Sequence, residues 1–224
     1  MCIRDRYIGF NTSNKLDSDI LLRKAINYAI DRDKMIKFLR KNIGYPASNG
    51  IVPNGLNNNF ISNRYLKDID KAKILIDKYK QINKIDDINL DVTTDAQYLD
   101  VLEFVQSELK LIGIKLNINL TPPSILRQGK ATGKFQMFRA SWIADYGNPE
   151  NYFSLFYSKN HTPFGPNYTY FSNEQYDILY EKTMTESDKN NLKKIYNQLE
   201  DIILSLIHIS EPTRRYAISY AVFC

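Results

Sequence analysis

The stretch Phe135-Gln-Met-Phe-Arg-Ala-Ser-Trp-Ile-Ala-Asp145-Tyr-Gly-Asn-Pro-Glu-Asn-Tyr-Phe-Ser-Leu-Phe-Tyr157 decides the fold. Its first half is apolar and aromatic, which predicts a buried strand. Turn-forming residues follow between Asp145 and Pro149. Asn148, Pro149 and Glu150 then favour the start of a helix, because Asn caps, Pro suits the first helical position and Glu suits the positive end of the helix dipole. We therefore expect a strand, a loop that carries an acid, and a helix; ligands of α/β proteins bind at such strand ends.

The two ends of the chain resemble the translation of a sequencing-library adapter. The similarity covers Met1-Cys-Ile-Arg-Asp5 and the segment that begins Leu204-Ser-Leu-Ile-His-Ile209. We expect residues 1–6 and 204–224 to be artefacts and residues 7–203 to be the natural part, a fragment of one domain's size. The alternative is a natural N-terminus and a natural C-terminal tail.

The composition excludes several classes of protein. Both cysteines, Cys2 and Cys224, fall in the suspect ends, so no disulfide is expected. Without those ends the net charge falls from +5 to +3, because four arginines and two acids are removed, and this argues against a nucleic-acid partner. No run is long and apolar enough to span a membrane. A fragment would not show a signal peptide, so the lack of one says nothing about location.

The remaining pattern alternates strands with helices. Strands are expected at 7–11, 88–94 and 114–120 and from residue 135 onward. Helices are expected after a cap at Asp17 or Ser18 and from Asp31, Asp68, residue 99, residue 124, Pro149, Asn173 and Asp188, with a loop at 42–59. This order predicts an α/β fold, a mixed, partly parallel sheet flanked by helices.

Five segments resemble, in order and spacing, the substrate-binding proteins of bacterial oligopeptide and dipeptide ABC transporters, the family 5 solute-binding proteins. They are Arg23-Lys-Ala-Ile-Asn-Tyr-Ala-Ile-Asp-Arg-Asp-Lys34, Asp68-Ile-Asp-Lys-Ala-Lys73, Leu111-Ile-Gly-Ile-Lys115, Trp142-Ile-Ala-Asp-Tyr146 and Asn173-Glu-Gln-Tyr-Asp177. The resemblance implies the second lobe of a two-lobed periplasmic-binding-protein-like (type II) fold. The first lobe and the final crossover to it are expected to be missing.

The resemblance also implies a function. The whole protein would bind a peptide outside the cytoplasm, in the periplasm or at the cell surface, and deliver it to ABC permease subunits. It would use no cofactor and no metal, and it would meet the membrane only through a signal or lipid anchor absent from this fragment. Within the same family the alternative solutes are nickel complexes and oligosaccharides.

Five residues are the expected ligand-binding set. By resemblance Asp145 would receive the peptide's α-ammonium and Arg139 its C-terminal carboxylate, while Trp142 and Tyr146 would form the wall of the pocket. Gln97, at the head of a helix together with Tyr98, aligns more loosely with a position facing the cleft. A carboxylate at a strand end makes a charge-assisted bond to an ammonium, and the fork of Arg suits a carboxylate.

Each of these residues also has a structural interpretation, which stays open. Asp145 could serve as a turn or cap residue, Trp142 could belong to the core, and Arg139 could be a surface strand residue paired with an acid. Asn148 to Glu150 could simply start a helix. His161 has no Cys or carboxylate partner at ligand spacing, which argues against a metal site.

An enzyme is the main competing class of function. Asp145 and Glu150 could form the carboxylate pair of a small α/β hydrolase. The natural part contains no GxSxG, HExxH or phosphate-loop motif and no nucleophilic cysteine, so we expect no catalytic residues. A nucleic-acid binder is a third class, but the lysines are interspersed with acids, as on an ordinary solvated surface.

Overall fold

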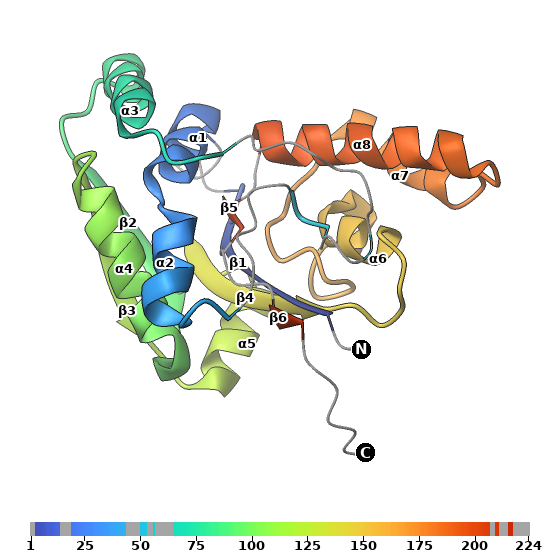
Figure 1. Cartoon of the computed structure of the whole chain (residues 1–224), viewed down its shortest axis with the longest axis horizontal. Helices are drawn as coiled ribbons and strands as arrows, with labels where there is room; N and C mark the ends of the chain where they lie inside the picture. The colour runs from blue at the N-terminus through green and yellow to red at the C-terminus, as the bar shows by residue number, and fades with distance from the viewer. Residues whose placement is uncertain are drawn as a thin grey trace.

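The computed structural model describes residues 3–13, 19–43, 50–52, 56, 65–206, 209–210 and 215–216 (Figure 1). The strands are β1 (Ile3–Phe10), β2 (Ile88–Thr94), β3 (Ile114–Leu120), β4 (Met137–Ile143), β5 (Ile209–Ser210) and β6 (Arg215–Tyr216). The α-helices are α1 (Ile20–Ala29), α2 (Arg32–Leu39), α3 (Ile69–Asn83), α4 (Leu99–Lys110), α5 (Pro123–Ala131), α6 (Glu150–Phe153), α7 (Glu174–Thr183) and α8 (Lys189–Leu206). Short 3-10 turns are η1 (Ala96–Tyr98), η2 (Ser154–Phe156) and η3 (Ser158–Asn160).

The sheet is mixed, as the alternation of strands and helices predicted. Its strand order is β3-β2-β4-β1-β5, and β6 also pairs with β1. Strand β2 runs parallel to β3 and to β4, whereas β1 runs antiparallel to β4, with Ile8 opposite Arg139. The α/β class and its mixed sheet are therefore confirmed.

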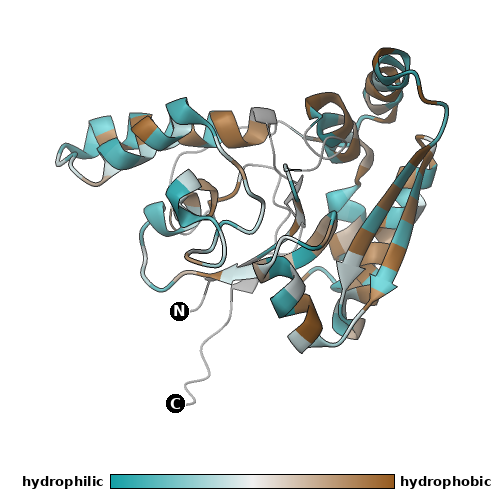
Figure 2. Ribbon diagram, turned by 180° about the vertical axis from the view of Figure 1, so that it is seen from behind, coloured by the Kyte–Doolittle hydropathy of each residue, from teal (hydrophilic) through white to brown (hydrophobic). Residues whose placement is uncertain are grey.

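The two faces of the sheet are covered by different helices. Ile8, Phe10 and Met137 face a core that also contains buried residues of α1, α3 and α4. The neighbouring residues Tyr7 and Phe138 point to the opposite face, where they pack with Leu126 of α5 and Ala140. This alternation follows from the two-residue period of a strand. Figure 2 shows hydrophobic and hydrophilic residues alternating along strands β2 and β3.

A second core lies beside the sheet and is rich in aromatic residues. It joins the segment after β4 to helices α7 and α8, which lie side by side in Figure 1. Its largest fully buried side chains include Tyr152, Phe153, Phe156 and Tyr176. The loop and short helix that follow β4 are thus anchored on the last two long helices of the chain.

Most of the expected helix starts are confirmed by their hydrogen bonds. Asp31 Oδ1 accepts from the Lys34 N–H at 2.8 Å, Asp68 Oδ1 from the Lys71 N–H at 2.9 Å, and Asn173 Oδ1 from the Tyr176 N–H at 2.8 Å. The first helix differs, because Asp19 caps it by accepting from the Leu21 N–H at 2.8 Å. The expected caps Asp17 and Ser18 lie outside the described residues, as does most of the expected loop at 42–59.

The expected boundaries of the natural part fall inside elements. Residue 6 lies within β1, which begins at Ile3, and residue 203 lies within α8, which ends at Leu206. Residues 209–210 and 215–216, from the segment expected to be an artefact, pair with β1. The division at residues 6 and 203 stays a prediction.

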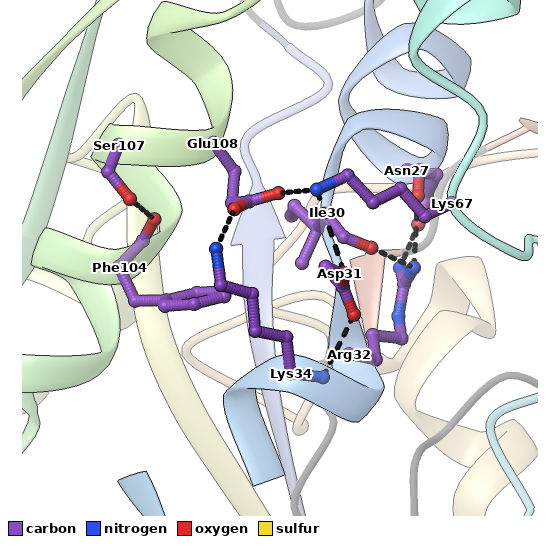
Figure 3. A network of polar contacts seen from close by, with 9 residues as sticks. All are labelled: Asn27, Ile30, Asp31, Arg32, Lys34, Lys67, Phe104, Ser107 and Glu108. Carbon is purple, nitrogen blue, oxygen red and sulfur yellow. Dashed lines mark hydrogen bonds and ion pairs between the residues drawn. The ribbon is translucent and has the colours of Figure 1, made fainter. Parts of the chain in front are cut away.

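A buried glutamate links three segments of the first core (Figure 3). Glu108 of α4 is 3% exposed, and its Oε2 lies 2.6 Å from Lys67 Nζ. Its Oε1 lies 3.6 Å from Lys34 Nζ, and Lys67 Nζ also lies 3.6 Å from Asp31 Oδ2. Burial lowers the pKa of Lys67, but the hydrogen bonds and charges of Glu108 and Asp31 outweigh burial and raise it overall. The network fixes α2 and the segment before α3 against α4.

Candidate ligand-binding site

The expected site residues lie after the carboxyl ends of β2 and β4. These strands are parallel, with Thr93 opposite Phe138, so β4 continues past the end of β2. The 3-10 turn η1 follows β2, and the loop with Asp145 follows β4. Because the carboxyl ends of parallel strands meet at one edge of a sheet, both segments lie at the edge where α/β folds bind ligands.

Arg139 is buried on β4 and packs against an aromatic ring. Arg139 is 7% exposed, and its Cζ lies 3.1 Å from the centroid of the Tyr98 ring. The interpretation of Arg139 as a surface strand residue is therefore wrong. Stacking on an aromatic face suits the planar guanidinium and holds it in a fixed orientation.

Gln97 lies in a separate, shallow hollow at the same edge of the sheet. Its backbone N–H donates to Asp95 Oδ1 at 2.9 Å, and Gln97 itself is exposed. The hollow is lined by Asp95, Ala96, Gln97 and the segment 120–123 that leads into α5. Gln97 is followed in the chain by Tyr98, whose ring contacts Arg139.

Trp142 is half-buried and has a fixed orientation. Its Nε1–H donates to Asn151 Oδ1 at 2.7 Å, and Asn151 is itself buried. Its ring packs against both the aromatic core and the cluster on the α5 face of the sheet. Trp142 is therefore partly a core residue, and its hydrogen bond to Asn151 joins the end of β4 to helix α6.

Asp145 is exposed at the end of this strand. Among the described residues, its carboxylate makes no hydrogen bond and no ion pair. The interpretation of Asp145 as a cap is not supported, since the backbone N–H of Glu150 instead donates to Asn148 Oδ1 at 3.0 Å. An exposed carboxylate at this edge is free to accept from a ligand.

Glu150 holds two tyrosine side chains. One carboxylate oxygen accepts from the Tyr146 hydroxyl and the other from the Tyr180 hydroxyl of α7. The hydrogen bond to Glu150 is the main cause that raises the pKa of Tyr146, and burial followed by the same carboxylate raises that of Tyr180. Both oxygens of Glu150 are thus engaged, which argues against its use as one half of a catalytic carboxylate pair with Asp145.

Asn148 is held in the same way from α8. Its Oδ1 accepts from the Tyr196 hydroxyl at 2.9 Å. Burial is the main cause that raises the pKa of Tyr196 to about 12, so the hydroxyl stays protonated and available as a donor at neutral pH. Asn148 to Glu150 therefore start the helix α6 and also join the loop to two distant helices.

Two functional candidates, Tyr180 and Tyr196, were missed by reasoning from the sequence, and the contact of Tyr98 with Arg139 was not predicted. Tyr176 and Tyr180 do share one helical face at a spacing of four, which is a signal for burial but not for a bond to Glu150. Contacts between segments this distant depend on tertiary packing, which local patterns do not encode.

The described residues contain no group of three or more His, Cys, Asp or Glu side chains that could hold a metal ion. His161 Nε2 lies 2.8 Å from the backbone oxygen of Phe171, and the His161 ring lies 5.5 Å from that of Tyr170. The neighbours of His161 are thus a backbone oxygen and an aromatic ring, which indicates a structural role for this residue. None of the described helices has the length and hydropathy needed to cross a bilayer.

The fold is that of part of the periplasmic binding proteins. The DppA protein of Helicobacter pylori, an ABC transporter-associated periplasmic binding protein solved with the peptide STSA, superposes with a TM-score of 0.82 at 24% identity, covering 95% of this chain and 42% of that one. The chain therefore has the fold of part of this class of protein, and its candidate site lies at the carboxyl ends of the strands.

The chain belongs to the bacterial extracellular solute-binding proteins, family 5, because the model of that family's middle region matches residues 3–164. It is 24% identical to the dipeptide-binding protein of Escherichia coli (strain K12), over 96% of this chain and 43% of that protein. It is 28% identical to the glutathione-binding protein GsiB of Escherichia coli O6:K15:H31, over 90% of this chain and 40% of that protein.

Two conclusions follow from these similarities. The family is one of binding proteins and not of enzymes, which confirms the expected class. The chain spans about two fifths of the length of the curated relatives it matches.

Proposed function

We propose that this chain is one lobe of an extracytoplasmic peptide receptor, which passes its ligand to an ABC permease. In this proposal the chain supplies one wall of the site, and a second lobe closes over the ligand by a hinge motion. The family membership supports solute binding, and the names of the relatives support a ligand of peptide type.

The observation that carries the proposal is the state of Asp145. Its carboxylate is exposed and lacks a polar partner among the described residues, whereas its neighbours Trp142 and Tyr146 are each held by a hydrogen bond. A loop this well fixed around one unpaired acid suits the capture of a cationic group. The α-ammonium of a peptide is such a group, and its bond to a carboxylate strengthens as the closing lobes exclude water.

The other expected residues take supporting roles in this proposal. Arg139 would meet the peptide's carboxylate with its guanidinium held over the Tyr98 ring. Tyr146 would offer its exposed ring, because its hydroxyl already donates to Glu150. Gln97 would contact the ligand from the hollow after β2.

The substitution Asp145→Asn in the full-length protein tests the ammonium anchor. A hydrogen bond to a charged group contributes about 1.5–3 kcal/mol, so we expect the Kd for a tripeptide with a free amino group to rise roughly ten- to hundredfold. Isothermal titration calorimetry measures this, and N-acetylation of the same peptide should weaken binding to the unsubstituted protein by a similar factor. An unchanged Kd in the Asp145→Asn protein would refute the anchor.

The same titration separates the alternative solutes. A neutral oligosaccharide gains nothing from a carboxylate anchor, so its affinity should not depend on Asp145. A nickel complex would be revealed by binding that requires the metal. Binding of either of these with no response to free-amino peptides would replace the peptide proposal within the same family.

A further inference from the structure

The loop that carries Asp145 has little regular structure of its own. It runs from the end of β4 at Ile143 to the start of α6 at Glu150. One internal backbone bond, from the Asn148 N–H to the Tyr146 oxygen at 3.0 Å, lies within it. A loop of this kind depends on side chains from elsewhere to hold its acid in place.

Two tyrosines from the last two long helices supply these contacts. Tyr180 of α7 donates its hydroxyl to Glu150, and Tyr196 of α8 donates its hydroxyl to Asn148 Oδ1 at 2.9 Å. Glu150 and Asn148 flank Pro149, so the C-terminal end of the loop is held from two directions. Glu150 also accepts from Tyr146, the residue directly after Asp145.

Both tyrosines are rigid donors because their rings are packed on other rings. Tyr180 is 3% exposed, and its ring lies 4.7 Å from that of Tyr157 and 6.5 Å from that of Tyr176. Tyr196 is 6% exposed and stacks on Phe153 at 5.3 Å with an interplanar angle of 18°. A hydroxyl on a ring fixed in this way defines where its acceptor must lie.

We propose that Tyr180 and Tyr196 are positioning residues, which hold the Asp145 loop in its binding geometry through Glu150 and Asn148. The importance of that geometry for ligand affinity rests on the function proposed above. A loop already held in one conformation loses less conformational entropy when a ligand binds, so the two tyrosines increase affinity without touching the ligand. Helices α7 and α8 thereby act on the site through the loop.

Hydrogen exchange in the 224-residue chain tests the positioning directly, with no ligand present. The reporters are the amides of Asn148 and Glu150, which bond to the Tyr146 oxygen and to Asn148 Oδ1. We expect Tyr180→Phe and Tyr196→Phe each to speed their exchange roughly tenfold, the effect of losing one hydrogen bond. The β2 amides, which lie in the other core, should keep their protection and so confirm that the variants fold.

Tyr157→Phe is the matched control. The Tyr157 hydroxyl also donates to a glutamate, Glu181 Oε1 at 2.5 Å, and its ring packs in the same core, but this bond does not reach the loop. We expect Tyr157→Phe to leave exchange at Asn148 and Glu150 within twofold of the unsubstituted chain. If Tyr180→Phe loses the β2 protection as well, Glu150→Gln replaces it, since that change weakens the acceptor without removing a packed ring. Unchanged loop exchange in the folded variants, or an equal change in the control, would overturn the proposal.

Peptide binding by the full-length protein then tests the consequence for affinity. Tyr180→Phe should raise the Kd for a free-amino tripeptide about five- to tenfold, and Tyr157→Phe should not. A rise in Kd without faster loop exchange would contradict positioning as the cause. Should the unsubstituted protein bind no peptide, the proposed function fails, while the exchange experiment still decides whether the tyrosines hold the loop.

Discussion

The guanidinium carbon of Arg139 lies 3.1 Å from the centre of the Tyr98 ring, although the two residues come from different segments of the chain. Tyr98 is 7% exposed and ends the 3-10 turn that follows β2, whereas Arg139 lies in β4. The ring therefore links the head of α4 to the central strand. It also covers the guanidinium at the edge of the sheet where we propose that the ligand binds.

Replacing Tyr98 should separate the role of the ring from that of its hydroxyl. Tyr98→Leu removes the aromatic face, and we expect the free energy of unfolding to fall by about 2 kcal/mol, the value of a desolvated cation–π contact. Tyr98→Phe keeps the face and should cost less than about 1 kcal/mol. Urea denaturation of both variants measures the difference, and equal losses would show that the stacking on Arg139 contributes nothing.

The buried carboxylate of Glu108 gives a second prediction. Glu108→Ala leaves Lys67 without its closest acceptor inside the protein, and removal of one partner from a buried pair costs about 3 kcal/mol or more. Lys34→Ala is the matched change on the exposed side of the network, where the charges lie 3.6 Å apart, and should cost less than about 1 kcal/mol. Chemical denaturation compares the two, and similar losses would contradict the ranking.

The partial burial of Lys130 in α5 leads us to predict that the free energy of unfolding depends on pH. Burial, together with the charges of Arg139 and Arg127, lowers the pKa of Lys130 to about 8, whereas the unfolded chain keeps it near 10.5. The unfolded state thus binds more protons between pH 8 and 10.5, so this group's contribution to stability rises with pH across that window. Below pH 8 the cost of burying the charge is fully present.

Two substitutions at this position measure the effect. Lys130→Met removes the charge, so its free energy of unfolding should exceed that of the unsubstituted chain by roughly 1–3 kcal/mol at pH 7, and the difference should shrink as the pH rises through 8. Lys130→Arg keeps the charge at every pH in this range and should show no such gain. A difference for Lys130→Met that stays constant from pH 7 to 10 would refute the assignment.

The separate chain should bind peptides weakly. If the ligand is held between two lobes, residues 7–203 provide only one side of the site and cannot exclude water from the Asp145 contact. We expect a Kd above about 1 mM for a free-amino tripeptide, against a much lower value for the full-length protein. A micromolar Kd for residues 7–203, measured by calorimetry, would show that one lobe suffices.

The regular elements were the most predictable part of the fold. Strands β2 and β3 occupy the expected residues, 88–94 and 114–120, because their apolar residues recur with the period of a strand and turn signals bound them. Asp31, Asp68 and Asn173 cap their helices as expected, since a cap is a local contact of two or three residues. The helix after Asn148 was also expected, but it is four residues long and continues as a 3-10 turn.

The candidate site was less predictable, because its geometry depends on distant partners. The pattern around Arg139 gave no sign that Tyr98 would cover it. The sequence around Glu150 likewise contains nothing that indicates Tyr180. Resemblance to a family identified Asp145 as a candidate for the site, and only packing between remote segments reveals which neighbours are free to meet a ligand.

The pairing of β1 with β4 has a consequence for how the chain folds. Ile8 lies opposite Arg139, so β1 can pair with β4 only after the region from β2 to β4 has been synthesised. Contacts this distant in sequence close a large loop and slow folding, whereas β2, α4 and β3 are close neighbours in the chain. We therefore expect the parallel strands β2 and β3 to assemble first and β1 to join β4 late in folding.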